Sequence, residues 1–206
     1  AAQLTAAAEA KVAPLVNQVI GIAAGDITRT ENAAGESALG NLIADAQRAA
    51  LGTDFAFMNP GGIRADVAAG EVTWGELFTV QPFGNSLVKM DLTGQQVYDL
   101  LNQQWAGQPF ARILKTSGLT YVWDNALPIG NRVLVVYKDG APIDKAATYS
   151  VTVNSFLADG GDNFTVLRNG TSRVGGPVDL DALIDYIKAV PQPFSAAVEA
   201  RIQRIN

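Results

Sequence analysis

The second half of the chain constrains the fold most, because three strand-like segments follow one another there without a helical pattern between them. They span Leu119–Trp123, Val133–Tyr137 and Tyr149–Val153, and the turn signals Pro128-Ile129-Gly130 and Asp139-Gly140 separate them. Consecutive strands without strict strand–helix alternation favour an α+β fold over a doubly wound parallel sheet. With 206 residues, the chain can bury a hydrophobic core without cross-links. We therefore expect a single α+β domain with a mixed β-sheet flanked by helices.

The first half predicts helices where a capping residue precedes an apolar stripe. Ser37 is placed to cap a helix over residues 38–51. Thr73 and Thr93 are each followed three residues later by Glu or Gln, which is the spacing of a capping box. Alternating or apolar residues predict strands over residues 55–58 and 86–92.

The two ends of the chain are both predicted to be helical. Residues 1–19 place Leu4, Ala8 and Val12 on one face, and we expect this helix to connect an upstream domain to a domain formed by residues 20–206. Near the other end, a helix over residues 179–190 stops before Pro191, and a short tail helix is expected to reach Asn206.

The composition excludes several classes of chemistry. The chain has no Cys and no His, which removes thiol catalysis, Ser-His-Asp arrangements and zinc sites built on these ligands. Its net charge of −5 argues against a surface for a nucleic acid polymer, which would need a basic stripe. The absence of a run of 18 apolar residues predicts no membrane span.

Three glycine-containing loops could bind a ligand. In the first, Asn59-Pro60-Gly61-Gly62-Ile63-Arg64, paired glycines permit close backbone approach and Arg64 offers a fork for phosphate or carboxylate. An ordinary turn with a surface arginine is the alternative. In the second, Gln81-Pro82-Phe83-Gly84-Asn85, the ring of Phe83 either provides a stacking face or plugs the loop onto the sheet.

The third loop runs from Asn154 to Phe164. Asp162 could accept hydrogen bonds from a pair of hydroxyls, as in a ribose, and Phe156 could supply a second ring face. A plain turn is again the alternative. Taken together, the three loops offer an anion clamp, two ring faces and a diol acceptor, which is the set of groups that a nucleotide requires.

Four blocks in order carry a resemblance to a known family: ESALGNLIADA, NPGGIRADV, EVTWGELFTVQPFGNSLVKMDLTGQQV and NSFLADGGDNF. From about residue 20 to 187 the chain resembles the C-terminal, substrate-binding domain of the 5'-nucleotidase / UDP-sugar hydrolase family. The resemblance implies that Phe83 and Phe156 sandwich the base and that Asp162 binds the ribose hydroxyls. It also implies that Arg64 contacts the phosphate, with Asn59 and Asn85 holding the nucleoside. For a second phosphate-contacting arginine, Arg29 is the position that we select.

The same resemblance implies that the reaction takes place in another domain. Family members carry a divalent metal pair in an N-terminal metallophosphoesterase domain, where water attacks a 5'-phosphate. We therefore expect this chain to bind a nucleotide or nucleoside, to need no cofactor of its own and to be inactive alone. The family implies a periplasmic, secreted or cell-surface location. A non-catalytic binding module remains an alternative, as does the substrate domain of a cyclic-nucleotide phosphodiesterase or nucleotide-sugar hydrolase.

Overall fold

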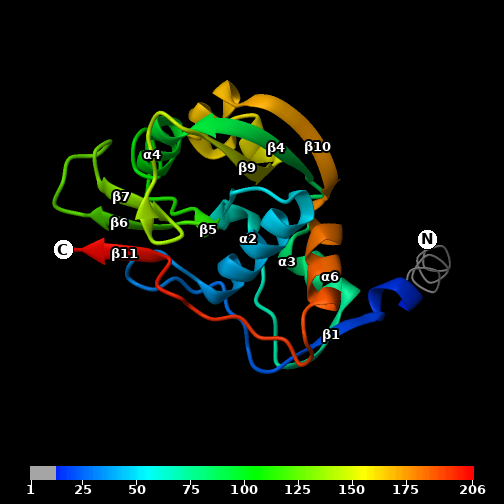
Figure 1. Ribbon diagram of the computed structural model, residues 1–206. Helices are drawn as coiled ribbons and strands as arrows, with labels where there is room; N and C mark the ends of the chain where they lie inside the picture. Colours follow the sequence, from blue (N-terminus) through cyan, green and yellow to red (C-terminus); the bar gives the residue numbers. More distant parts are fainter. Residues whose placement is uncertain (1–12) are drawn as a thin grey trace.

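The computed structural model describes residues 13–206, and its helices and strands form an α+β fold (Figure 1). The largest sheet has five strands, in the order β10 (Thr171–Val178), β4 (Ser86–Thr93), β9 (Thr148–Asn154), β2 (Phe55–Met58) and β5 (Lys115–Ser117). Its β2–β9 pair is parallel and its other neighbours are antiparallel, so the sheet is mixed. The predicted fold class is confirmed.

The other strands described form two smaller sheets. A four-stranded sheet has the order β11 (Ile202–Ile205), β6 (Thr120–Asp124), β7 (Val133–Lys138) and β8 (Ala141–Pro142). Figure 1 shows β6, β7 and β11 side by side at one end of the molecule. The remaining pair joins β1 (Val19–Ala23) to β3 (Gly70–Thr73). The strand segments expected in the second half of the chain correspond to β6, β7 and β9.

Local capping signals begin the helices where the sequence predicts them. The helices are α2 (Ala38–Leu51), α3 (Trp74–Val80), α4 (Gly94–Asn102), α5 (Ser155–Ala158) and α6 (Asp179–Ala189). The hydroxyl of Ser37 accepts a hydrogen bond from the Gly40 amide at the start of α2. Thr73 and Thr93 both form the expected capping boxes, at the starts of α3 and α4. Short 3₁₀ turns cover Pro60–Gly62, Gly161–Asn163 and Thr165–Asn169.

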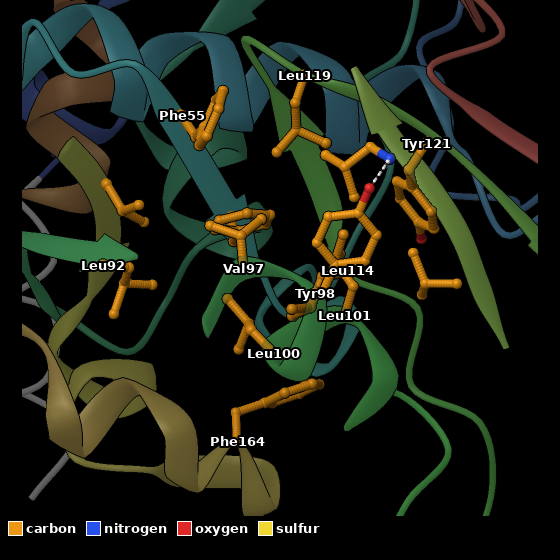
Figure 2. Close-up of a cluster of buried hydrophobic side chains, with 14 of the residues drawn as sticks. Phe55, Leu92, Val97, Tyr98, Leu100, Leu101, Leu114, Leu119, Tyr121 and Phe164 are labelled. Atoms are coloured by element: carbon orange, nitrogen blue, oxygen red, sulfur yellow. Dashed lines mark hydrogen bonds between the residues drawn. The ribbon is translucent and has the colours of Figure 1, made fainter. Parts of the chain in front are cut away.

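The large sheet separates two hydrophobic clusters. Phe55 and Phe57 of β2 belong to one cluster, together with residues of α4, α5 and the four-stranded sheet. Figure 2 shows part of this cluster, with Phe55, Val97 and Tyr121 among the labelled residues. Met58 belongs to the other cluster, with residues of α2, α3, α6 and β1. Successive side chains of a strand point to opposite faces, so β2 contributes to both cores and its carboxyl end is held from both sides.

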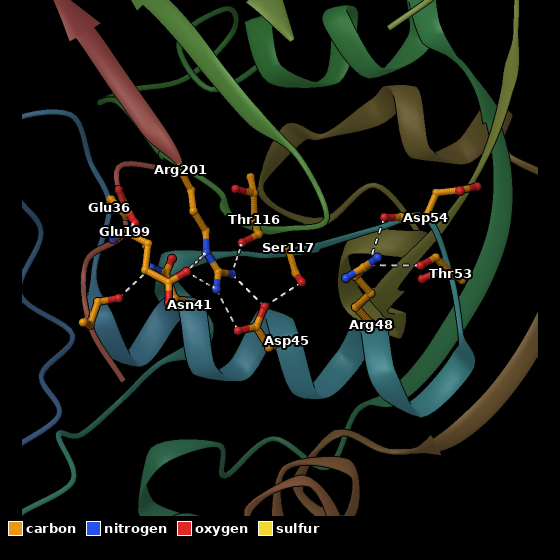
Figure 3. A network of polar contacts seen from close by, with 11 residues as sticks. Glu36, Asn41, Asp45, Arg48, Thr53, Asp54, Thr116, Ser117, Glu199 and Arg201 are labelled. Carbon is orange, nitrogen blue, oxygen red and sulfur yellow. Dashed lines mark hydrogen bonds and ion pairs between the residues drawn. The ribbon is translucent and has the colours of Figure 1, made fainter. Parts of the chain in front are cut away.

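The predicted tail helix is wrong, because the chain ends in the strand β11, parallel to β6. The Arg201 guanidinium donates to both carboxylate oxygens of Asp45 on α2, each at 2.7 Å, and to the Thr116 carbonyl at 2.9 Å (Figure 3). The buried Glu36 carboxylate accepts from the Glu199 amide at 2.8 Å. These tertiary contacts hold the tail extended beside β6. No local sequence pattern predicts them.

At the start of the chain, residues 13–16 are helical and β1 begins at Val19. Leu4, Ala8 and Val12, which the predicted connector helix would place on one face, lie outside the described residues. The connector over residues 1–19 and the domain boundary at residue 20 therefore remain predictions.

Candidate functional site

Three loops meet at one edge of the five-stranded sheet. The segment after Met58 leaves the carboxyl end of β2, and the segment after Asn154 leaves the carboxyl end of β9, which is parallel to β2. The residues before Ser86 lead into β4, which is antiparallel to β9, so its start lies at the same edge. Ligands of α/β proteins commonly bind outside the carboxyl ends of parallel strands, and the three loops predicted from the sequence gather at this place.

The loops enclose a cavity of about 470 Å³. Its lining residues are Asn59, Gly61, Gly62, Phe83, Asn85, Phe156 and Asp162. Five of the seven predicted site residues are therefore brought together around one space: Asn59, Asn85, Asp162 and both phenylalanines. Arg64 and Arg29 do not line this cavity.

Both phenylalanine rings are exposed. Phe83 is 59% exposed and Phe156 is 44% exposed, so neither ring plugs a loop onto the sheet. The ring of Phe156 rests on the loop that follows it, where a Cβ at Gly161 would lie 2.6 Å from two of the ring carbons. An exposed aromatic face at the wall of a cavity can stack against a planar ligand.

A chain of buried amides holds the carboxylate of Asp162 at the cavity wall. The Asn154 amide donates to the Asn59 amide oxygen at 3.0 Å, and the Asn59 amide donates to Asp162 Oδ2 at 3.1 Å. Asn154 also caps α5, where its side-chain oxygen accepts from the Leu157 amide at 2.8 Å. This supporting role of Asn154 is not among the sequence predictions, although an Asn between a strand and a short helix is a capping signal.

Asp162 also contacts a segment far away in the sequence. The side-chain amide of Gln108 donates to the backbone carbonyl of Asp162 at 2.6 Å, and Arg112 Nε lies 3.7 Å from Asp162 Oδ1. Neither Gln108 nor Arg112 is among the residues predicted from the sequence. Their contacts depend on tertiary folding, and no local pattern singles them out.

Asn85 joins the cavity to α6 and α5. Its carbonyl accepts from the Asp179 amide at 2.8 Å, and its side-chain oxygen accepts from the Ser155 hydroxyl at 3.3 Å. Asp179 is the first residue of α6 and is buried. Burial raises the pKa of Asp179 to about 6, against the opposing effect of hydrogen bonds from the Leu180 amide and Asn85.

The two predicted phosphate-binding arginines lie along the first loop and outside the cavity. Arg64 Nη1 is 3.4 Å from the Gly61 carbonyl, and Arg29 Nη1 donates to the Ile63 carbonyl at 3.0 Å. Arg29 also borders a second cavity of about 290 Å³, together with Pro60 and Ile63. The same loop thus has the main cavity on one side and Arg29 on the other.

A buried lysine that is not among the sequence predictions lines this second cavity. Lys115 of β5 is 1% exposed, and its ammonium group pairs with the Glu31 carboxylate and donates to the Gly35 carbonyl. Burial lowers the pKa of Lys115, although Glu31 acts in the opposite direction. This pair ties the loop that follows Arg29 to the five-stranded sheet.

The described residues contain neither a cluster of metal ligands nor a membrane-spanning helix. Between residues 13 and 206, no three or more acidic side chains come together in a way that could hold a metal ion. Within the same range, every helix is too short or too polar to cross a membrane.

The cavity lies at the carboxyl ends of parallel strands, has two exposed rings and is lined by the Asp162 carboxylate, which the buried amides of Asn59 and Asn154 support. Concave sites of this kind are typical of domains that bind small organic molecules. The sequence model described as "5'-nucleotidase, C-terminal domain" matches residues 16–169. The chain belongs to this family of C-terminal domains. The resemblance found in the sequence is thereby confirmed.

Individual relatives agree with this assignment. The chain is 40% identical to "Endonuclease YhcR" of Bacillus subtilis over 192 residues, covering 92% of this chain and 16% of that protein. It is 36% identical to "Protein UshA" of Escherichia coli over 160 residues, covering 73% of this chain and 27% of that protein. The crystal structure of a 5'-nucleotidase precursor from Thermus thermophilus superposes with a TM-score of 0.86 and 38% identity, covering 99% of this chain and 43% of that one. The chain therefore spans less than half the length of these relatives.

Proposed function

We propose that this domain binds a nucleotide and presents its phosphate to a hydrolytic centre in a preceding domain of the same protein. The observation that carries the proposal is the cavity in which Phe83 and Phe156 are exposed beside the Asn59–Asp162 pair. In this proposal the two rings stack on the base and Asp162 accepts from the ribose hydroxyls. Asn59 and Asn85 hold the nucleoside through their amide groups.

The phosphate of the nucleotide would contact Arg64 and Arg29. The Arg29 guanidinium is hydrogen-bonded to the Ile63 carbonyl of the first loop, and the Arg64 guanidinium lies 3.4 Å from the Gly61 carbonyl of the same loop. The phosphate of a nucleotide bound in the cavity would extend over this loop and lie near the two positively charged guanidinium groups. The planar guanidinium group can donate two parallel hydrogen bonds to phosphate oxygens.

We assign the metal chemistry to the preceding domain, as the family resemblance implies. A divalent metal pair in an N-terminal metallophosphoesterase domain would activate water and stabilise the charge of the phosphoryl group. We therefore propose that this chain binds substrate but hydrolyses none alone. One relative, of Listeria monocytogenes, is named a cell wall protein, and we propose a periplasmic, secreted or cell-surface location for this protein too.

Calorimetric titration of the 206-residue chain with AMP and with adenosine tests the proposal. Phe83→Ala is expected to weaken both ligands by about 5- to 150-fold, because stacking contributes about 1–3 kcal/mol per base. The matched control is Phe78→Ala. Phe78 is 44% exposed but stacks on Trp74 outside the cavity, so its removal should leave both affinities unchanged.

Two results would contradict the proposal. One is a wild-type chain that binds neither ligand at millimolar concentration, and the other is an equal loss of affinity in the two variants. Competition by a nucleotide-sugar and by a cyclic nucleotide in the same titration ranks the substrate classes. AMP is expected to displace adenosine best, since its free phosphate can reach both arginines.

A further inference from the structure

The segment from Gln108 to Arg112 reaches the cavity wall but has no part in the proposed function so far. Arg112 Nε lies 3.7 Å from Asp162 Oδ1, and the Gln108 amide donates to the Asp162 carbonyl at 2.6 Å. Arg112 Nη1 in turn donates to the side-chain oxygen of Gln108. One arginine and one glutamine therefore fasten both the side chain and the backbone of Asp162.

We propose that Arg112 is a positioning residue that aims the Asp162 carboxylate at a vicinal diol, and so makes the site prefer ribonucleotides to 2'-deoxyribonucleotides. This inference rests on the proposed function. It adds Arg112, which need not touch the ligand, and a preference for ribonucleotides that follows from the orientation of the Asp162 carboxylate.

The hydrogen-bonding capacity of the carboxylate supports this inference. Two carboxylate oxygens offer about four lone pairs, and the Asn59 amide uses one of them, on Oδ2. At 3.7 Å, Arg112 Nε is beyond the roughly 2.7–3.2 Å range of a hydrogen bond, so Oδ1 can still accept from a hydroxyl. Arg112 supplies compensating charge without consuming the acceptor, and both oxygens remain able to receive one hydroxyl each.

The loop around Asp162 needs such support. Asp162 has a φ of 52°, a left-handed conformation that is uncommon outside glycine, although Asp and Asn adopt it more readily than other residues do. The adjacent Asn163 is also left-handed, with a φ of 63°. A backbone of this kind persists only where contacts fix it, and the Gln108–Asp162 hydrogen bond is one of them.

Arg112 makes further contacts that restrict its position beside Asp162. Its guanidinium lies 4.5 Å from the centre of the Phe110 ring, and its backbone amide donates to the Gln104 carbonyl at 2.9 Å. The side chains of Arg112 and Asp162 are 21% and 19% exposed, so solvent screens their attraction only in part. An arginine held by a ring, an amide and its own backbone loses little further entropy by staying beside the carboxylate.

The test compares the dissociation constants of AMP and 2'-deoxy-AMP in the wild type, Arg112→Ala, Arg112→Lys and Arg168→Ala. The wild type is expected to bind AMP about tenfold or more tightly than 2'-deoxy-AMP, because a hydrogen bond to a charged group is lost. Arg112→Ala should reduce this ratio to about twofold, mainly by weakening AMP. Arg112→Lys should restore part of it, because the positive charge is retained but the hydrogen bond from Nη1 to the Gln108 side chain is lost.

Arg168 is the matched control, since it anchors the same loop elsewhere. Its Nε donates to the Asp159 carbonyl at 2.9 Å, whereas the ion pair of the Asp162 carboxylate is with Arg112. Arg168→Ala is expected to leave the AMP to 2'-deoxy-AMP ratio as in the wild type, even if both affinities fall.

An equal loss for both ligands in Arg112→Ala would overturn the inference and leave the proposed function standing, because Arg112 would then only stabilise the loop. A wild type that binds the two ligands equally would overturn it as well. A wild type that binds neither ligand would refute the proposed function itself.

Discussion

Substituting Gly161 by alanine should disturb the stacking surface without removing either ring. The new Cβ would lie 2.6 Å from Cε1 and Cζ of Phe156 and 2.6 Å from the Phe156 carbonyl oxygen, whereas ordinary contact begins at 3.4 Å. The ring and the loop must therefore separate by about 0.8 Å (3.4 − 2.6). The carbonyl is part of the backbone and cannot rotate away as a flexible side chain could.

The magnitude follows from how steeply contact energy falls with distance. If the Phe156 ring is displaced from the base by this distance, the contact between ring and base loses a quarter to a half of its dispersion energy. Base stacking is worth about 1–3 kcal/mol. We expect a loss of about 1 kcal/mol in adenosine binding, or about fivefold in Kd. Overpacking of this kind also destabilises the fold by about 1–3 kcal/mol, which lowers Tm by about 2–4 °C for each kcal/mol.

Calorimetry with adenosine measures the first effect and thermal unfolding the second. Gly25→Ala is the control, because a Cβ there would meet nothing within 4 Å. If Gly161→Ala bound adenosine as tightly as the wild type, Phe156 could not be a stacking face held in place by this loop, and the reasoning would be refuted.

Two further predictions concern stability. Asp179→Asn should flatten the pH dependence of stability between about pH 4 and 6: burial raises the pKa of Asp179 from 3.8 to about 6, so the wild type loses stability as pH rises through this window. Denaturant titrations across the window measure this, and equal slopes in wild type and variant would contradict it. Arg201→Ala should lower the free energy of unfolding by about 2–3 kcal/mol, because it leaves Asp45 without its bidentate partner and frees the tail before β11. Adenosine binding should be unaffected, since Arg201 lies outside the cavity, and a weakened Kd in a folded variant would count against this division of roles.

The parts of the fold that local signals specify could be predicted from the sequence. The capping residues Ser37, Thr73 and Thr93 begin α2, α3 and α4 as expected, and alternating or apolar residues locate β2 and β4. These patterns act over a few residues and do not depend on the rest of the chain.

The strands that depend on distant partners could not be predicted in the same way. β10 contains two glycines and a proline, which lower strand propensity, and it forms at the sheet edge against β4. β11 pairs with β6, about 80 residues earlier in the chain, and the Arg201–Asp45 clamp supports it. A helix is what local apolar spacing predicts for the tail, and tertiary pairing overrides it.

The candidate site follows the same division. Glycines and aromatic residues single out the three loops in the sequence, and sheet pairing explains why they meet. The sequence did not predict that Arg64 and Arg29 lie outside the cavity, nor that Gln108 and Arg112 reach Asp162 across about 50 residues. Those positions depend on how the loops pack against one another, and the spacing of residues along the sequence does not predict that packing.

The most direct test of a nucleotide site between the three loops is an NMR titration of the isotope-labelled chain with AMP. We expect the amide signals of Gly61, Phe83, Asn85, Phe156 and Asp162 to shift together and to saturate with a single Kd. Signals from the four-stranded sheet, for example Val135 and Lys138, should stay in place. Shifts that cluster elsewhere, or no saturable shift at millimolar AMP, would contradict the account.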